Sequence, residues 1–414
     1  MRSDEKCKKK SFFHLYNEDK VWYNKYESNE RNDPMKIVIA IDSFKGSLSS
    51  ARAAAAVKEG VLAACPTAEL VTSPLADGGE GTAEAVTTAL GGERVSLTVT
   101  GPLGTPVTAS YGFIRESKTA VMEMAAAAGI TLIKQEERDP RRATTYGVGE
   151  MIRHAAEMGA RRFIIGIGGS ATNDGGVGML SALGFSFLDK DGAPIPNGAA
   201  GLTALHTIRA EGAEAALAEC EFLVACDVTN PLCGPTGCSA VYGPQKGVTP
   251  DEVPLMDKWL AAYAEKTKAT LPHADPDFPG SGAAGGLGFA LRTYLGATLQ
   301  SGVSLVLDAT RLAEKIKEAD LVITGEGRLD GQTVMGKAPI GVAKLAKEFC
   351  KPVVAFSGCV GEGAALCNQH GIDAFFPILQ SPCTLAEALN EENAYHNLKA
   401  TATQAVRLFL IKHA

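Results

Sequence analysis

Charged side chains and glycines gather in short segments that follow apolar, strand-like runs. The run IVIAI leads into DSFKGS, which carries Asp42 and Lys45, and a later segment of this kind, SPLADGGEGT, carries Asp77. In an open parallel sheet, ligands bind outside the carboxyl ends of the strands, where such segments lie. Asp before glycine is also a common turn former. The occurrence of Asp and Lys together at one strand end favours a functional interpretation over a plain turn.

A third segment, TGEGRLDGQTVMGK, follows the apolar run ADLVI. It carries Glu326, Arg328 and Lys337 among four glycines. We predict a glycine-rich loop from residue 325 to residue 337. Carboxylates and cations packed into one glycine-rich loop are suited to binding a metal-bound polyphosphate. A solvated loop with no ligand is the alternative.

The most glycine-rich segment is GIGGSATNDGGVG, residues 166–178, directly after the run RRFII. It lacks the lysine of a Walker A loop. It offers many unhindered backbone N–H groups before a helix, an arrangement suited to phosphate oxygens, and Asp174 could bind a metal or a hydroxyl. Tight packing against the backbone of another segment is the alternative.

The same segment also fits a looser dinucleotide-binding pattern, GxGxxA, through Gly166, Gly168 and Ala171, with Asp189 at a plausible distance. This pattern keeps an NAD-dependent hydroxy-acid oxidoreductase open as a second function. A single GxGxxA is a weak signal, and polar residues fill the positions where that motif would already be helical.

Two further segments belong with these loops. CDVTNPLCGPTG carries Asp227 after the run FLVAC and is followed by YGPQKG, which carries Gln245 and Lys246, while PGSGAAGGLGFAL is a second glycine-rich entry into an apolar helix. Each could be a turn without a ligand. No Ser-His or Cys-His candidate stands out and GxSxG is absent. Asp, Lys, Arg and glycine are the residues of phosphoryl transfer rather than of acyl or hydride chemistry.

Seven motifs, in this order, resemble those of the bacterial glycerate kinase family. They are IVIAIDSFKGSLS, PLADGGEGT, GPLGTPV, GIGGSATNDGGVG, CDVTNPLCG with YGPQKG, GSGAAGGLG, and ITGEGRLDGQT with GKAPIGVA. The resemblance implies an α/β fold with a discontinuous, doubly wound, flavodoxin-like parallel-sheet domain and an inserted mixed α/β domain of the restriction-endonuclease-like kind. It also implies transfer of the γ-phosphoryl group of Mg-ATP to D-glycerate, generally giving 2-phosphoglycerate. Glycerate 3-kinase regiochemistry is an alternative.

The predicted site residues take three roles in this hypothesis. Those expected to bind the nucleotide are Gly168, Gly169, Ser170, Thr172, Asn173, Gly175, Gly325, Gly327, Arg328 and Lys337. Those expected to hold Mg²⁺, directly or through water, are Asp174, Asp227 and Glu326. A carboxylate must accept the proton of the substrate hydroxyl, and we expect Asp77, or else Asp42, to do so while Lys45 faces phosphate or carboxylate.

Alternating strand and helix patterns at both ends of the chain predict a parallel sheet that positions these loops. Strands are predicted at residues 37–41 and 69–72 and again in ADLVITGE, PVVAFSG and DAFFPI. In the middle, residues 93–123 alternate around the turn GPLGTP and predict antiparallel hairpins. We expect one domain from residues 35–92 and 300–414, an inserted domain at 93–299, and a disordered extension at 1–34.

Composition restricts the class of protein. The formal net charge of −7 and the pI of about 5.6 argue against nucleic acid or an anionic membrane as a partner. No apolar stretch reaches the roughly 18 residues that cross a bilayer. Ten cysteines without a CxxC pair are typical of reduced thiols in a cytoplasmic protein. The expected partners are therefore two small molecules, ATP and D-glycerate, and the sequence does not give the oligomeric state.

Overall fold

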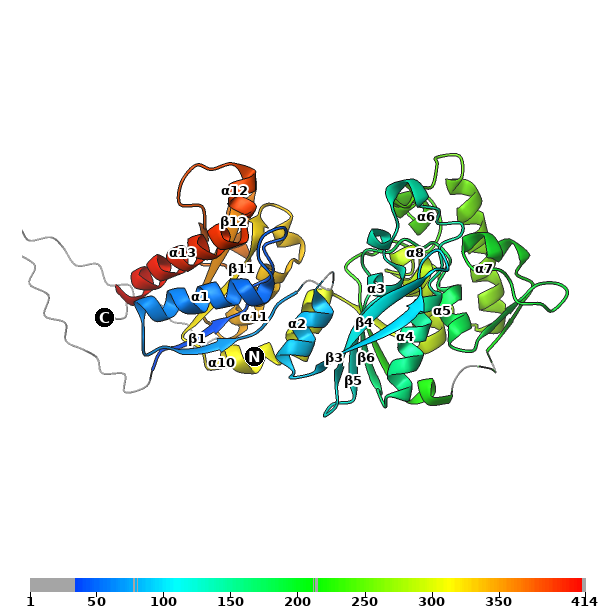
Figure 1. Cartoon of the computed structure of the whole chain (residues 1–414), viewed down its shortest axis with the longest axis horizontal. Coiled ribbons are helices and arrows are strands. Elements are labelled where there is room, and N and C mark those ends of the chain that lie inside the picture. Colours follow the sequence, from blue (N-terminus) through cyan, green and yellow to red (C-terminus); the bar gives the residue numbers. More distant parts are fainter. Residues whose placement is uncertain (1–33, 77–78, 80, 211, 213–214, 412–414) are drawn as a thin grey trace, which may run out of the picture.

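The computed structural model describes residues 34–76, 79, 81–210, 212 and 215–411. Figure 1 shows two parts, one built from both ends of the chain and one from its middle. Within the described residues, no helix combines the length and the apolar character needed to span a membrane. All nine cysteines described are free thiols. The α/β class predicted from the sequence is confirmed.

The two ends of the chain form one parallel, five-stranded sheet. Its strands are β1 (Lys36–Ile39), β2 (Glu69–Thr72), β11 (Leu321–Leu329), β12 (Val353–Val360) and β13 (Ala374–Pro377), in the order β13-β12-β11-β1-β2. Numbered within the sheet, this is the flavodoxin-like order 2-1-3-4-5. The strand order reverses between β1 and β11, so a ligand crevice is expected at the carboxyl ends of those two strands.

Side chains of β1 alternate between two apolar layers. Ile37 and Ile39 pack with α1 (Ser50–Ala64) and α13 (Glu391–Ile411), whereas Val38 packs with α9 (Gly302–Ala309), α10 (Leu312–Lys317) and α11 (Ala338–Glu348). Because successive side chains of a strand point to opposite faces, a sheet covered by helices on both faces needs a continuous apolar run. This explains the sequence KIVIAI.

The middle of the chain forms a six-stranded mixed sheet. Its strands are β3 (Glu93–Thr100), β4 (Pro106–Ile114), β5 (Thr119–Glu123), β6 (Arg162–Gly166), β9 (Glu221–Ala225) and β10 (Thr298–Gln300), in the order β10-β9-β6-β5-β4-β3. The predicted antiparallel hairpins are confirmed in β3, β4 and β5. Strands β5, β6, β9 and β10 pair in parallel, so their carboxyl ends share one edge.

The remaining elements are helices and one small hairpin. The other α-helices are α2 (Thr82–Ala89), α3 (Ala125–Ala128), α4 (Tyr146–Glu157), α5 (Val177–Ala182), α6 (Cys238–Tyr242), α7 (Val253–Thr270), α8 (Ala283–Leu295) and α12 (Leu385–Leu389). A small hairpin pairs β7 (Ser186–Leu188) with β8 (Thr207–Arg209). The 3-10 helices are η1 (Ile130–Leu132), η2 (Gln135–Glu137), η3 (Ala199–Ala204), η4 (Ala215–Glu219), η5 (Pro244–Lys246), η6 (Thr333–Met335) and η7 (Ala364–His370).

Helices α2 and α9 lie between the two sheets. One apolar cluster contains Val86 of α2, Val303 of α9, Ile164 of β6 and Ile340 of α11. The core is therefore continuous from one sheet to the other. The assignment of residues 35–92 and 300–414 to one domain stays a proposal, because α2 and α9 lie in this shared core.

One prediction of local structure was wrong in its extent. Residues 327–329, which lie beyond the predicted strand ADLVITGE and are expected from the sequence to be loop, continue strand β11. The reason is that β12 is long enough to pair with them, with Arg328 opposite Cys359. The side chains of Glu326 and Arg328 are therefore held by a strand.

Candidate functional site

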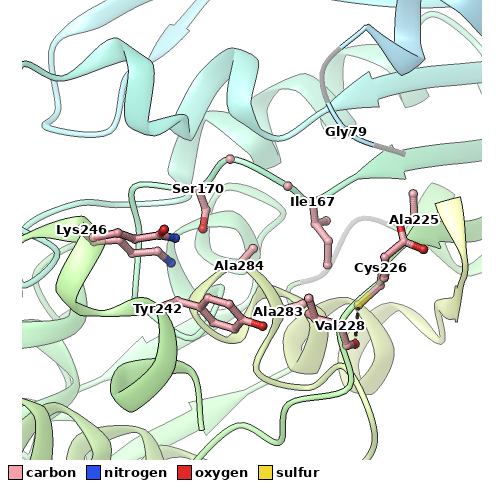
Figure 2. A pocket seen from close by; sticks show the side chains of 14 residues that line it. Gly79, Ile167, Ser170, Ala225, Cys226, Val228, Tyr242, Lys246, Ala283 and Ala284 are labelled. Atoms are coloured by element: carbon pink, nitrogen blue, oxygen red, sulfur yellow. Dashed lines mark hydrogen bonds between the residues drawn. The ribbon is translucent and has the colours of Figure 1, made fainter. Parts of the chain in front are cut away.

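A pocket of about 310 Å³ lies at the carboxyl ends of β6 and β9. Figure 2 shows its lining: residues at or after the ends of β6 and β9, Tyr242 of α6, Gln245 and Lys246 of η5, and Ala283 and Ala284 at the start of α8. Gly79, from the connection between β2 and α2, also borders it. Because β6 and β9 pair in parallel, the segments that follow them emerge side by side. The pocket thus lies where an α/β sheet usually binds its ligand.

The first half of the glycine-rich segment borders this pocket. Gly168, Gly169 and Ser170 line it, and Gly169 adopts a φ of +73°. Their backbone N–H groups donate to no acceptor within the described part of the chain. A side chain at Gly168 would extend toward Gly79, whose Cα would lie 3.9 Å from the added Cβ. These three residues can therefore offer amides and one hydroxyl to an anionic ligand.

The second half of the segment is packed against other backbone. Thr172 and Asn173 are fully buried, and the Asn173 side-chain amide donates to the Ser239 hydroxyl at 2.9 Å. The Gly175 N–H donates to the carbonyl of Gly285 at 2.9 Å. Thr172, Asn173 and Gly175 therefore contact protein, although the sequence predicts that they bind the nucleotide.

The packing partner is the other glycine-rich segment, GSGAAGGLG. A Cβ added to Gly285 would lie 2.1 Å from the Thr172 carbonyl oxygen, and one added to Gly286 would lie 2.7 Å from the Gly175 Cα. Ala284, Gly285 and Gly286 have positive φ angles and interrupt the first turn of α8. Glycines of the two segments are thus needed so that their backbones can touch. The contact also fixes Ala284, which lines the pocket.

Asp174 organises this packing. Its carboxylate is fully buried and accepts hydrogen bonds from the Thr145 N–H at 2.8 Å, the Thr145 hydroxyl at 2.9 Å, the Gly176 N–H at 3.1 Å and the Gly178 N–H at 3.3 Å. Burial raises the pKa of the carboxyl, and these four donors oppose that shift. Asp174 thus joins the loop to Thr145 at the start of α4. Because four donors already occupy its oxygens, we do not propose it as a metal ligand.

Lys246 is a buried cation at the pocket. The residue is 2% exposed, lines the pocket, and its Nζ donates to the Thr172 carbonyl at 2.7 Å. Burial lowers the pKa of this lysine to about 8. Within the described residues, Lys246 forms no ion pair with a carboxylate. The sequence alone does not single out Lys246, because the segment YGPQKG is equally typical of a turn.

Asp227 is the carboxylate at the same pocket. It lines the pocket, is exposed, and accepts the N–H of Gly302 at 3.1 Å, the first residue of α9. This contact connects the pocket to the helix shared by the two sheets. Asp227 lines this pocket and not the switch point that carries Glu326, so we do not include it in the metal set proposed below.

The second group of predicted residues meets at the switch point of the five-stranded sheet. The pairing of β1 with β11 continues through the hydrogen bond from the Asp42 N–H to the Gly325 carbonyl at 2.9 Å, and this register aligns Asp42 with Glu326. Asp42 is 8% and Glu326 9% exposed. Two nearly buried carboxyl groups therefore lie at neighbouring positions where a ligand crevice is expected.

Glu326 is held by a hydroxyl and a cation. Its Oε1 accepts the Thr333 hydroxyl at 2.8 Å, and the Lys337 Nζ lies 3.6 Å from its Oε2. Burial raises the pKa of the carboxyl, against the effect of Thr333 and Lys337. Arg328 points elsewhere and pairs with Asp330 at 3.0 Å. Glu326 and Lys337 thus form an ion pair in this region, and Arg328 belongs to a separate ion pair with Asp330.

Lys45 lines a second pocket, of about 330 Å³, at the same end of the sheet. Phe44, Gly327 and Leu385 of α12 also border it. The close approach of the two strand ends explains the glycine: a Cβ on Gly327 would lie 3.3 Å from the Lys45 backbone nitrogen. Lys45 and Gly327 are therefore brought together, as expected from their positions after β1 and in β11.

Two candidates stand apart from these groups. Asp77 lies outside the described residues, although its neighbour Gly79 lines the first pocket. Asp189, the acidic residue of the NAD-binding alternative, accepts N–H groups from Asp191 and Ala193 within its own turn. Helix α5 begins only at Val177, so the GxGxxA glycines do not open a helix as that motif requires.

The donors fit magnesium only together with a phosphate ligand. Among the described residues, no group of three or more His, Cys, Asp or Glu side chains could hold a metal ion. Mg²⁺ is usually held by one or two carboxylates and the oxygens of its nucleotide. The neighbouring Asp42 and Glu326 satisfy that requirement at the switch point.

Comparison with known proteins agrees with this arrangement. The model of the glycerate kinase family matches residues 37–410. The chain belongs to the glycerate kinase family. The predicted family is thereby confirmed.

Individual relatives cover nearly the whole chain. Glycerate 2-kinase of Escherichia coli K12 is 49% identical over 88% of this chain and 95% of its own length, and glycerate kinase of Bacillus subtilis 168 is 45% identical over 91% and 100%. A crystal structure of a Salmonella typhimurium LT2 protein assigned as glycerate kinase 2 superimposes with a TM-score of 0.85 at 46% identity, covering 92% of this chain and 99% of that one.

Proposed function

We propose that this chain is an ATP-dependent kinase that phosphorylates D-glycerate and releases 2-phosphoglycerate. The observation that carries the proposal is the alignment of Asp42 with Glu326 at the switch point, beside Lys337, in a member of the glycerate kinase family. The E. coli relative named glycerate 2-kinase supports the position of the phosphoryl group.

In this proposal the switch point binds the nucleotide. Asp42 and Glu326 would hold Mg²⁺, and Lys337 would face the phosphate oxygens. When bound, the metal neutralises charge on the triphosphate. Holding Glu326 on a strand and Asp42 at the end of a paired strand fixes both carboxyl groups before the nucleotide arrives, which lowers the entropic cost of binding.

The reaction forms one bond and breaks one. The substrate hydroxyl oxygen forms a bond to the γ-phosphorus while the bond from that phosphorus to the leaving ADP oxygen breaks, and a carboxylate accepts the hydroxyl proton. Asp77 is our first candidate for that carboxylate and Asp42 the second; if Asp42 accepts the proton, Glu326 alone would hold the metal. The pocket with Gly168 and the switch point must meet for transfer, so we also propose closure around both ligands, which small-angle scattering would detect as compaction with an ATP analogue and D-glycerate together.

Two experiments test the proposal. ATP and D-glycerate are supplied to the purified protein, and product is detected through enolase without a phosphoglycerate mutase. A signal supports 2-phosphoglycerate, ADP release without that signal indicates 3-phosphoglycerate, and no ADP release refutes the activity.

The metal role is tested by Glu326→Gln, which keeps the side-chain shape. We expect its apparent requirement for Mg²⁺ to rise by about 10-fold or more, because a charged ligand of the metal is lost. Glu348→Gln, an exposed position on α11, is the matched control. An equal Mg²⁺ requirement in both variants would remove Glu326 from the metal site.

A further inference from the structure

Lys246 is a buried cation for which the protein supplies no countercharge at hydrogen-bond distance. An ammonium has three donors, and the Nζ of Lys246 uses one on the Thr172 carbonyl at 2.7 Å. No other acceptor in the described ranges forms a hydrogen bond with it. A charge without a partner is costly to bury, and such residues cluster at binding sites.

The ammonium faces a pocket of the right size for a small ligand. Figure 2 shows the Lys246 side chain extending toward Ser170 and Ala284, with Tyr242 on the adjacent side. The pocket, about 310 Å³, also exposes the backbone of Gly168 and Gly169. An anionic group next to Lys246 would therefore find a cation, a hydroxyl and unhindered amides together.

The charge of the pocket selects among anions. Lys246 is the only cationic side chain among its described lining residues, and Asp227 is the only carboxylate. A triphosphate carries several negative charges and would meet one cation and one opposing carboxylate. A hydroxy acid carries a single negative charge, which Lys246 alone can balance.

We propose that this pocket is the acceptor subsite and that Lys246 binds the carboxylate of the hydroxy acid. The inference rests on the proposed kinase function and assigns the two ligands to different parts of the molecule: the acceptor to the six-stranded sheet and the nucleotide to the five-stranded sheet. The contact of Lys246 with the Thr172 carbonyl holds the ammonium in place. The packing of Gly285 against Thr172 therefore helps to position the cation of the subsite.

The first test replaces Lys246 with methionine, which keeps an unbranched stem and removes the charge. We expect the KM for D-glycerate to rise by about 10- to 100-fold, the range for loss of a charge-assisted hydrogen bond, with the KM for ATP within about 2-fold of wild type. Lys258→Met, an exposed lysine on α7, is the control and should match wild type. If Lys246 had only a structural role, its replacement would not raise the KM for D-glycerate while leaving the KM for ATP unchanged.

A second measurement needs no variant. Isothermal titration of wild-type protein with D-glycerate, in buffers of different ionisation enthalpy at about pH 8.5, reports proton uptake. Because the pKa of Lys246 is about 8, a bound carboxylate should draw a proton onto it. The titratable groups near the ammonium are Cys238 and Asp174, and Asp227, Tyr242 and Cys226 line the pocket further along.

The outcomes separate this inference from the function. If wild-type protein releases ADP with D-glycerate but the Lys246 variant keeps its KM for glycerate and binding takes up no proton, the subsite is wrong and the kinase stands. A raised KM for ATP with an unchanged KM for glycerate would assign the pocket to the nucleotide and also overturn the inference. If wild-type protein has no activity with D-glycerate, the kinase proposal itself fails.

Discussion

Replacing Gly285 by alanine tests whether the two glycine-rich segments are packed backbone to backbone. The added Cβ would lie 2.1 Å from the Thr172 carbonyl oxygen, closer than any real contact. The obstacle is a backbone atom of the segment that leads to the pocket, so no side-chain rotation relieves it. Either α8 or residues 172–175 must move.

The expected size of the effect comes from a matched pair within one helix. Gly285 has a φ of +67° and Gly296, the C-cap of α8, has a φ of +65°, but nothing lies within 4 Å of a Cβ built at Gly296. Alanine at either position costs about 1–2 kcal/mol for its left-handed backbone. Only Gly285→Ala adds overpacking, of about 1–3 kcal/mol. The unfolded chain changes equally in both variants, so their difference isolates the steric contact.

Calorimetric unfolding of the two variants measures this difference. For a part of about 200 residues, 1 kcal/mol corresponds to about 2–4 °C, so Gly285→Ala should melt about 2–12 °C below Gly296→Ala. Activity should fall as well, because the displaced backbone continues into Gly168 and Ala284 at the pocket. Equal melting temperatures would refute the packing argument and return residues 172–175 to the candidate binding surface.

The remaining predictions concern charged groups. Asp77→Asn should lower kcat strongly with the circular dichroism spectrum unchanged, since the amide cannot accept a proton; wild-type turnover would remove Asp77 from the mechanism. Lys45→Ala should reduce kcat/KM more than Lys58→Ala, an exposed lysine on α1, and small equal effects would defeat that assignment. Burial lowers the pKa of Lys246 to about 8. Below that pH the native protein carries a buried charge, which lowers the free energy of unfolding, and above it the side chain is neutral in the native state. Lys246→Met should therefore gain in Tm over wild type at pH 7, and the gain should shrink as the pH rises from about 8 toward the ordinary lysine value. A gain that does not depend on pH would show that this titration does not govern stability.

Much of the scaffold is predictable from sequence because its signals are local. The alternation of apolar strands and helices at both ends of the chain predicts a parallel sheet, and the turn GPLGTP predicts the hairpin of β3 and β4. Polar residues at the end of β1 are expected at the ligand edge for the same reason. The extent of β11 is different: residues 327–329 are strand because β12 lies beside them, and glycine and charge in the sequence favour a loop.

The candidate site is less predictable because glycine has two uses that look alike in sequence. Gly168 and Gly169 border a pocket, while a Cβ added a few residues later would meet Tyr263 of α7 at Gly175 and Ala290 of α8 at Gly176. Which use applies depends on what lies opposite, and that is set by tertiary packing.

Asp174 shows the same dependence for a carboxylate. Among glycines it suggests a metal ligand, yet its partner Thr145 lies 29 residues earlier in the chain and turns it into a buried anchor. The burial of Lys246 likewise depends on the Thr172 carbonyl, 74 residues away. Polar residues whose role is set by such distant contacts become interpretable only when the fold is known. The hydrogen bonds that bury Asp174 and the one that holds Lys246 at the pocket both depend on the position of residues 172–178. Binding of a ligand to Lys246 would therefore depend on the packing of Thr172 against Gly285.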